Sequence, residues 1–334
     1  MTSPWRYFAL LPFVTAPLSA QQQVVPAPAP PGRLVDIGGG QRLQLNCRGT
    51  GTPAVVFEAG AGDFSFVWSL VQPDIARRTT ACSYDRGGYA WSDPGRRPRS
   101  YRQLALELHT LLARAGVPGP YLLVGQSYGG LLARGFAAAY PREVSGMVLV
   151  DAAHEDQRLM QAGRPVAIRS WARGRIAPPP ALALDQALLD SLRAARAVPA
   201  LDSVLDSPLA RLSPADQRLW RWAMNLPVGA ATRALEMDWS PEELARMHDA
   251  RRRVPQSLGT LPLFVIERAP DPADPLAAEH HAQQVDLTRL SSRGRLLTAA
   301  HAGHNVHLED PALVVQAIDS VLAAAAAPPA RHAP

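Results

Sequence analysis

A serine stands between two glycines in the stretch Gly125-Gln126-Ser127-Tyr128-Gly129. A serine hydroxyl is a weak nucleophile at neutral pH and becomes reactive when a neighbouring base takes its proton. The apolar residues 122–125 are typical of a short buried strand, and residues 131–140 of a helix, with Pro141 after it. A serine at such a strand-to-helix turn presents its Oγ for attack on a substrate, whereas a serine that only caps the helix would be inert.

The two glycines favour the reactive arrangement. A strand that reverses directly into a helix crowds the Cβ atoms two residues before and two residues after the serine, and Gly125 and Gly129 have none. The serine itself must adopt a strained backbone conformation. We therefore expect Ser127 to be a nucleophile.

The base that Ser127 requires is best supplied by His304. This histidine lies in the loop after the last expected strand, where its imidazole could reach the serine. His301 and His307 share a three-residue spacing with it, which raises the alternative of a metal site. No cysteine or carboxylate motif of the zinc-enzyme type accompanies them, so the sequence favours a base and predicts no metal and no cofactor.

Alternating strands and helices surround these residues from position 33 onward. Residues 33–47 form an expected hairpin that turns at three glycines, and residues 311–326 an expected helix with Asp310 as its N-cap. This alternation predicts a mostly parallel sheet with helices on both faces, built from residues 33–151 and 260–326. Residues 327–334 are expected to be a disordered tail.

Residues 152–259 interrupt the alternation. They contain helical patterns, proline breaks and no convincing strand, and are expected to form a helical cap inserted between two strands of the sheet. The alternative is a disordered linker, but four of the seven tryptophans lie here, which favours a folded segment. These tryptophans (Trp171, Trp220, Trp222 and Trp239) are expected to form the core of the cap rather than a substrate site.

Composition and the N-terminal segment indicate an exported globular protein. The chain is 47% hydrophobic and 19% charged, and all 34 cationic side chains are arginine. The arginine clusters lack interleaved aromatic residues, so no nucleic-acid partner is expected. Residues 1–20 have the layout of a signal peptide, whose apolar run is too short to span a membrane, and residues 21–32 form a proline-rich tether. The sequence assigns no oligomeric state.

The order of the motifs resembles the α/β-hydrolase superfamily. GQSYGG, the earlier EAGAG, the YDRGGYAWSDPG loop and the terminal AGHNVHLEDP follow one another as in that family, over roughly residues 33–325. The resemblance implies an eight-stranded sheet of order 1-2-4-3-5-6-7-8 whose second strand is antiparallel. Gln126 replaces the histidine that usually precedes the serine. Asp85 and Arg86 are expected to form an ion pair or a hydrogen-bonded corner under the site.

The resemblance leaves two candidates for the carboxylate that orients His304. Asp151 follows an apolar strand, 24 positions after Ser127 (151 − 127), as in the branch of the superfamily that takes its acid from the sixth strand. Asp271 aligns with the commoner position after the seventh strand, although Arg268 replaces the glycine usual in that loop. We favour Asp151 and keep Asp271 as the rival.

The resemblance also implies an oxyanion hole and a disulfide. The backbone N–H groups of Ala61 and Tyr128 match the family's oxyanion donors. The expected strand order makes the strands of Cys47 and Cys82 neighbours, and an oxidising compartment favours their pairing.

The implied function is that of a serine hydrolase acting on a small-molecule carboxylic ester. Serine at the elbow argues against epoxide hydrolase or dehalogenase chemistry, which uses an aspartate there in this fold. Two alternatives stay open: an amidase or peptidase similar to the proline iminopeptidases, and a non-catalytic ligand-binding protein.

Overall fold

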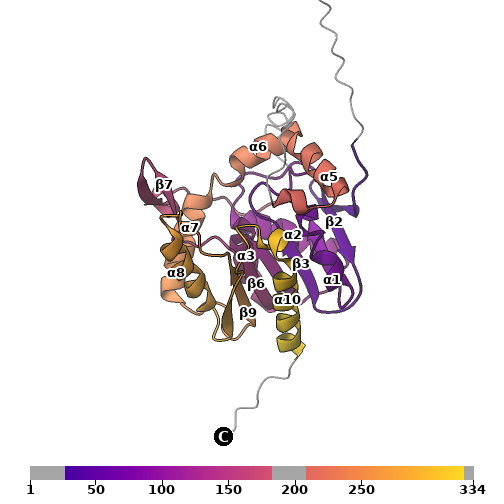
Figure 1. The fold of residues 1–334 in the computed structure, drawn as a ribbon. Coiled ribbons are helices and arrows are strands. Elements are labelled where there is room, and N and C mark those ends of the chain that lie inside the picture. The colour runs from indigo at the N-terminus through magenta and orange to yellow at the C-terminus, as the bar shows by residue number, and fades with distance from the viewer. Residues whose placement is uncertain (1–26, 183–207, 327–334) are drawn as a thin grey trace, which may run out of the picture.

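The computed structural model describes residues 27–182 and 208–326 (Figure 1). The expected signal peptide and C-terminal tail lie outside the described residues. Of the expected tether, residues 27–32 are described. They contain neither helix nor strand, and the carbonyl of Pro28 accepts a hydrogen bond from Trp91 Nε1 at 2.6 Å.

One large sheet forms the centre of the described chain. Its strands are β1 (Arg33–Gly38), β2 (Gln41–Arg48), β3 (Ala54–Glu58), β4 (Ala81–Tyr84), β5 (Tyr121–Gln126), β6 (Val144–Val150), β9 (Leu263–Glu267) and β10 (Gly294–Thr298). They lie in the order β1-β2-β4-β3-β5-β6-β9-β10. β2 is antiparallel to both of its neighbours, and all other pairs are parallel. With β9 and β10 as the seventh and eighth strands, the predicted order and fold class are confirmed.

Helices cover both faces of this sheet. They are α1 (Gln72–Ala76), α2 (Tyr101–Ala115), α3 (Tyr128–Ala139), α8 (Ala277–Thr288), α9 (Val306–Glu309) and α10 (Pro311–Ala326). Successive strand residues point to opposite faces, so Val56 packs in one buried cluster with α2, α3 and α8, and Val55 and Phe57 pack in another with α1 and α10. Figure 1 shows α10 across the near face of the sheet. Burial on both faces explains the almost uninterrupted apolar runs of the central strands.

The inserted segment, residues 152–259, differs in part from the expectation. Its described helices are α5 (Pro214–Met224), α6 (Pro227–Glu236) and α7 (Ser240–Arg253), and short 3₁₀ turns are η3 (Ile168–Trp171) and η4 (Leu209–Arg211). It also contains an antiparallel hairpin, β7 (Arg158–Gln161) and β8 (Arg164–Ala167), where no strand was expected. These strands are four residues long and largely exposed, so they lack the apolar alternation that marks a strand. α5 and α6 lie above the sheet, with β7 to one side (Figure 1).

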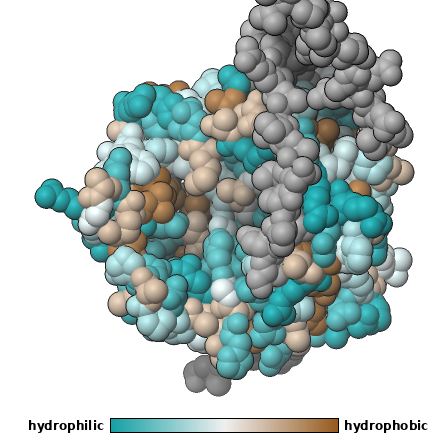
Figure 2. Space-filling model, turned by 45° about the horizontal axis from the view of Figure 1, so that its top comes forward, coloured by the Kyte–Doolittle hydropathy of each residue, from teal (hydrophilic) through white to brown (hydrophobic). Residues whose placement is uncertain are grey.

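In the described part of the inserted segment, two of the four tryptophans pack against the sheet domain. Trp220 and Trp222 pack with Phe64, Phe66 and Tyr89 from loops of the sheet domain. Trp171 is 41% exposed. For Trp220 and Trp222 the expectation of a core within the inserted segment is therefore wrong, because their side chains fill the contact between α5 and the loops beneath it. Figure 2 shows a largely hydrophilic surface on this side of the molecule, with hydrophobic residues gathered around one hollow.

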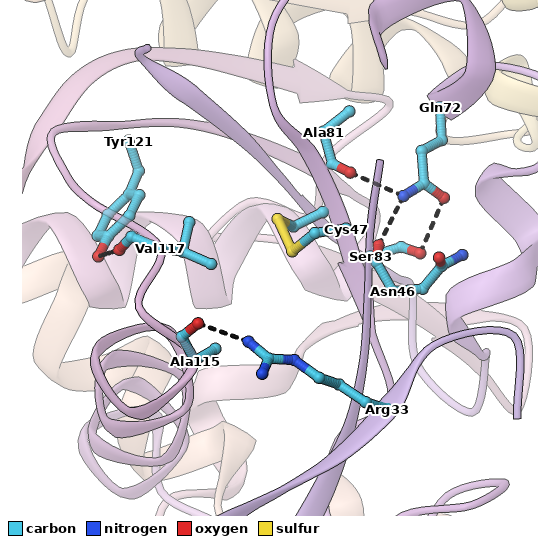
Figure 3. Close-up of a disulfide and its surroundings, with 10 residues drawn as sticks. Arg33, Asn46, Cys47, Gln72, Ala81, Ser83, Ala115, Val117 and Tyr121 are labelled. Carbon is cyan, nitrogen blue, oxygen red and sulfur yellow. Dashed lines mark hydrogen bonds between the residues drawn. A yellow bond between two sulfur atoms is a disulfide. The ribbon is translucent and has the colours of Figure 1, made fainter. Parts of the chain in front are cut away.

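The structure contains the Cys47–Cys82 disulfide expected from the strand order (Figure 3). The two cysteines lie directly opposite each other in the antiparallel pair of β2 and β4, with their Cα atoms 4.0 Å apart. Nearby, the Gln72 amide donates to the carbonyls of Asn46 and Ala81 and so ties α1 to the same two strands. In the chain-entropy account, closing a loop of this length stabilises the fold by about 3–4 kcal/mol.

Within the two described ranges, no helix has the length and the apolar composition that crossing a membrane requires.

Candidate active site

The expected elbow is formed by Ser127 between β5 and α3. Its backbone has φ 52° and ψ −120°, a left-handed region that a residue with a side chain rarely adopts. Although Ser127 occupies the N-cap position of α3, its side chain makes no capping hydrogen bond. The half-buried hydroxyl is therefore not used as a helix cap.

The elbow glycines are required by close backbone contacts. A Cβ atom on Gly125 would lie 2.5 Å from the carbonyl oxygen of Gly129, and a Cβ atom on Gly129 would lie 2.3 Å from that of Glu58. Both distances are far below a van der Waals contact. The crowding expected from the sequence is thus present at both positions, and β3 packs directly on the start of α3.

Asp151 and His304 are brought together by the sheet. Asp151 follows β6, and its Oδ2 lies 2.6 Å from His304 Nδ1 in the loop after β10. The Asp151 side chain is fully buried, whereas the imidazole is 47% exposed. The rival Asp271 is exposed and its Oδ1 accepts a hydrogen bond from the nearby Ala273 N–H at 2.9 Å. Of the two candidate carboxylates, Asp151 is the one hydrogen-bonded to His304.

Two further residues hold the Asp151 carboxylate, and neither was expected at the site from the sequence. His280 of α8 places its Nε2 atom 2.7 Å from Asp151 Oδ1, and the Arg268 N–H donates to the same oxygen at 3.0 Å. The Arg268 guanidinium lies 3.4 Å from Oδ2. Burial would raise the pKa of Asp151, but the hydrogen bonds from His280 and His304 outweigh it and lower that pKa. The carboxylate is therefore ionised across the physiological range.

Gln126 contacts the other side of the imidazole. Its amide nitrogen donates to the His304 carbonyl at 3.1 Å and lies 3.3 Å from His304 Nε2. Because Nδ1 faces a carboxylate, Nε2 is the unprotonated nitrogen that can accept a proton. Among the hydrogen bonds of the described residues none joins Ser127 Oγ to His304. Catalytic hydrogen bonds are often long in the free enzyme and shorten when substrate binds.

The two residues expected to supply the oxyanion hole lie at the start of α3 and in the turn after β3. Tyr128 is the first residue of α3, so its N–H has no partner within the helix. Ala61 is exposed in the turn after β3. A Cβ atom on the neighbouring Gly60 would lie 2.3 Å from Gln126 Oε1, so this turn packs beside the elbow.

The sequence predicts either an ion pair between Asp85 and Arg86 or a hydrogen-bonded corner at these two residues. The Arg86 guanidinium pairs with Glu58 at 3.0 Å and with Glu236 at 2.8 Å, and not with Asp85. Asp85 Oδ1 instead accepts a hydrogen bond from the Ser65 N–H at 2.7 Å. The predicted ion pair is wrong, because the Asp85 and Arg86 side chains bind different partners. The alternative, a hydrogen-bonded corner, is present.

The three histidines spaced three residues apart do not converge. His304 faces Asp151, whereas the buried His307 packs its ring 4.8 Å from that of Trp68. Burial lowers the pKa of His307 to about 3, so it is neutral. Within the described parts of the chain, no group of three or more His, Cys, Asp or Glu residues is arranged to hold a metal ion.

The fold and this set of residues agree with a match between residues 53–311 and the family model of the alpha/beta hydrolase fold. The chain therefore belongs to the alpha/beta hydrolase fold family, a class of hydrolases.

The individual proteins that this chain resembles are distant relatives. The chain is 27% identical over 304 residues to the probable transporter efuK of Hormonema carpetanum, covering 86% of this chain and 42% of that protein. It is 37% identical over 109 residues to the uncharacterized protein YqjL of Bacillus subtilis, covering 33% of this chain and 43% of that protein. The chain thus spans less than half the length of these curated relatives. A thermophilic esterase from Thermogutta terrifontis has a similar fold, with a TM-score of 0.59, 20% identity and coverage of 88% of this chain and 99% of that one.

Proposed function

We propose that the protein is a serine hydrolase that cleaves a carboxylic ester through an acyl-enzyme. The observation that carries this proposal is the 2.6 Å contact between Asp151 Oδ2 and His304 Nδ1 beside the strained Ser127. A carboxylate in this position fixes the tautomer of the imidazole and stabilises the imidazolium that forms during reaction. The imidazole held in this way is the base that a serine nucleophile needs.

The proposed reaction has two matched halves. Ser127 Oγ adds to the ester carbonyl while His304 Nε2 takes the hydroxyl proton, and the negative oxygen is held by the N–H groups of Ala61 and Tyr128. When the tetrahedral adduct collapses, the C–O bond to the alcohol breaks and His304 returns the proton to the departing oxygen. Water then repeats the sequence on the acyl-enzyme and releases the acid. No metal or organic cofactor takes part in this proposal.

A pair of matched substrates tests the ester assignment against the amidase or peptidase alternative. A 4-nitrophenyl ester and the 4-nitroanilide of the same short acyl group differ only in the leaving atom. We expect turnover of the ester, much slower turnover of the anilide, and loss of both in Ser127→Ala. Faster cleavage of the anilide would reassign the protein to the amidases, and no turnover across a range of acyl lengths would favour a binding protein.

We also propose that the inserted segment caps the site and that the protein is exported. Export is supported by the disulfide, since oxidising compartments retain disulfides. Fractionation of the producing cells, followed by intact-mass analysis of the protein in the fraction that holds it, tests this point. We expect a chain that begins at Gln21 and whose two cysteines resist alkylation until reduced. A full-length chain with two free thiols would contradict export.

A further inference from the structure

Arg86 holds the turn that carries Ala61. Its Nη1 donates to the Ala59 carbonyl at 2.8 Å and its Nη2 donates to the Gly60 carbonyl at 2.6 Å. In a trans peptide the carbonyl of one residue and the N–H of the next point in opposite directions. The N–H of Ala61 therefore points away from Arg86, and the guanidinium fixes the orientation of the proposed oxyanion donor without touching it.

Glu236 holds the same turn from the other side of Ala61. This glutamate is the last residue of α6, in the inserted segment, and its side chain is 1% exposed. Its Oε2 accepts a hydrogen bond from the Gly62 N–H at 2.8 Å and another from the Tyr89 hydroxyl at 2.7 Å. Its Oε1 accepts from Arg86 Nε at 2.8 Å. One carboxylate thus joins α6 to the turn and to the arginine that grips it.

Arg86 is a buried cation that pairs with two buried carboxylates, Glu58 and Glu236. Burial would raise the pKa of Glu236, but the charge of Arg86 outweighs it and lowers that pKa. For Glu58, which shares the arginine, burial is the larger effect and raises the pKa. Arg86 is buried between these two carboxylates, at 2.8 Å from Glu236 and 3.0 Å from Glu58, so loss of the Glu236 charge would remove one of its two charged partners.

We propose that Glu236 and Arg86 are positioning residues for the oxyanion hole, so that the Ala61 N–H is correctly aimed only while α6 is docked on the turn. Neither residue contacts the reacting atoms. The inference rests on the proposed function, because it assigns a task to the turn only if an oxyanion forms above it. It makes α6 a structural part of the catalytic geometry rather than only a cover over the site.

The variant Glu236→Gln tests this role at constant volume. A glutamine offers one acceptor oxygen, and its amide NH₂ must face a donor, either Arg86 or the Gly62 N–H. We expect kcat for the ester to fall about 10- to 100-fold with KM changed less than twofold, because loss of one oxyanion donor acts on the transition state. The matched control is Glu242→Gln in α7, which removes the charge of a buried carboxylate that pairs with the half-buried Arg175 in the same segment but does not contact the turn. It should keep wild-type kcat.

A boronic acid separates oxyanion stabilisation from general structure. Ser127 Oγ adds to boron, the hydroxyl proton passes to His304, and the resulting tetrahedral boronate carries the negative charge of the oxyanion. We expect the inhibition constant of the boronic acid to rise in Glu236→Gln by the same factor as kcat falls. The melting temperatures of Glu236→Gln and Glu242→Gln show whether both variants are folded. If Glu236→Gln does not fold, Tyr89→Phe removes one hydrogen bond to Glu236 and should shift kcat and boronate binding in the same direction by a smaller factor.

Unchanged kcat and boronate binding in the folded Glu236→Gln, or equal losses in Glu242→Gln, would overturn the inference. Folded Tyr89→Phe with both constants unchanged would do the same. Failure of the proposed function gives a different result, since either the wild-type protein would then not hydrolyse the ester or Ser127→Ala would retain that hydrolysis. The two failures are therefore distinguishable in one set of assays.

Discussion

The Oδ2 atom of Asp151 and the Nδ1 atom of His304 lie 2.6 Å apart, although 153 positions separate the two residues in the chain. They meet because β6 and β9 pair in parallel, as do β9 and β10, so that their carboxyl ends share one edge of the sheet. This edge is where ligands bind in open α/β sheets. The parallel strand order is therefore the physical cause of the candidate site.

Replacement of the carboxylate should cost most of the activity. In Asp151→Asn an amide faces His304 Nδ1, which disfavours the tautomer needed for proton transfer, and we expect kcat to fall by about 10⁴-fold. Asp271→Asn, at the rival position, should keep kcat within a few-fold of wild type. Steady-state kinetics on the ester decide between them, and the opposite pattern would assign the acid role to Asp271.

His280 should support the same carboxylate. His280→Leu removes one of the two donors to Asp151 Oδ1, and a lost hydrogen bond to a charged group costs about 1.5–3 kcal/mol, so kcat should fall at least tenfold. His280→Gln restores an N–H donor and should recover part of that loss. The control is His281→Gln, at a neighbouring residue that is paired with Glu267. Equal activity of the Leu and Gln variants at position 280 would argue against a hydrogen-bonding role.

The elbow should not tolerate a side chain at position 129. A Cβ atom there would lie 2.3 Å from the Glu58 carbonyl oxygen and 2.7 Å from that of Ala59, and both are backbone atoms of a buried segment. Gly129→Ala should destabilise the fold by about 1–3 kcal/mol or more, measured by urea unfolding. Gly135→Ala in the same helix approaches only Tyr101, at 3.2 Å, and should cost less. Similar stability of the two variants would contradict the elbow geometry.

Asp85 should make the stability of the protein depend on pH. Burial raises the pKa of Asp85 to about 7 in the folded chain, well above its value of about 4 in an unfolded chain. Between these values the folded state binds more protons, so stability is full below about pH 4 and falls as the pH rises to about 7. Asp85→Asn keeps an acceptor for the Ser65 N–H and should remove this loss. Melting temperatures at pH 5 and pH 8 test it, with Asp249→Asn, at an exposed residue of α7, as the control.

A decline in stability that persists between these pH values in Asp85→Asn would show that another group is responsible.

Regular elements and the nucleophile could be predicted because their signals are local. The helix α10 has the predicted bounds, and Asp310 caps it through a hydrogen bond from the Leu313 N–H at 3.1 Å. The glycines around Ser127 indicate crowding within the turn that holds this serine. The choice between Asp151 and Asp271 was harder, because it depends on how the loop after β9 folds. Arg268 directs that loop by pairing with Asp151 and Asp274.

Contacts between remote segments could not be predicted in the same way. The bond from the Gly62 N–H to Glu236 joins residues 174 positions apart, and nothing near either residue signals it. His280 was missed because α8 was not predicted, and the hairpin of β7 and β8 because its short strands are exposed. In each case the missing information is the position of one segment on another.

Covalent labelling of Ser127 tests the central claim most directly. A fluorophosphonate reacts with an activated serine by forming an O–P bond and releasing fluoride. We predict one adduct per chain, located on Ser127 by peptide mass spectrometry, absent in Ser127→Ala and formed far more slowly in Asp151→Asn. An adduct on another residue, or labelling of Ser127→Ala at the wild-type rate, would contradict the account.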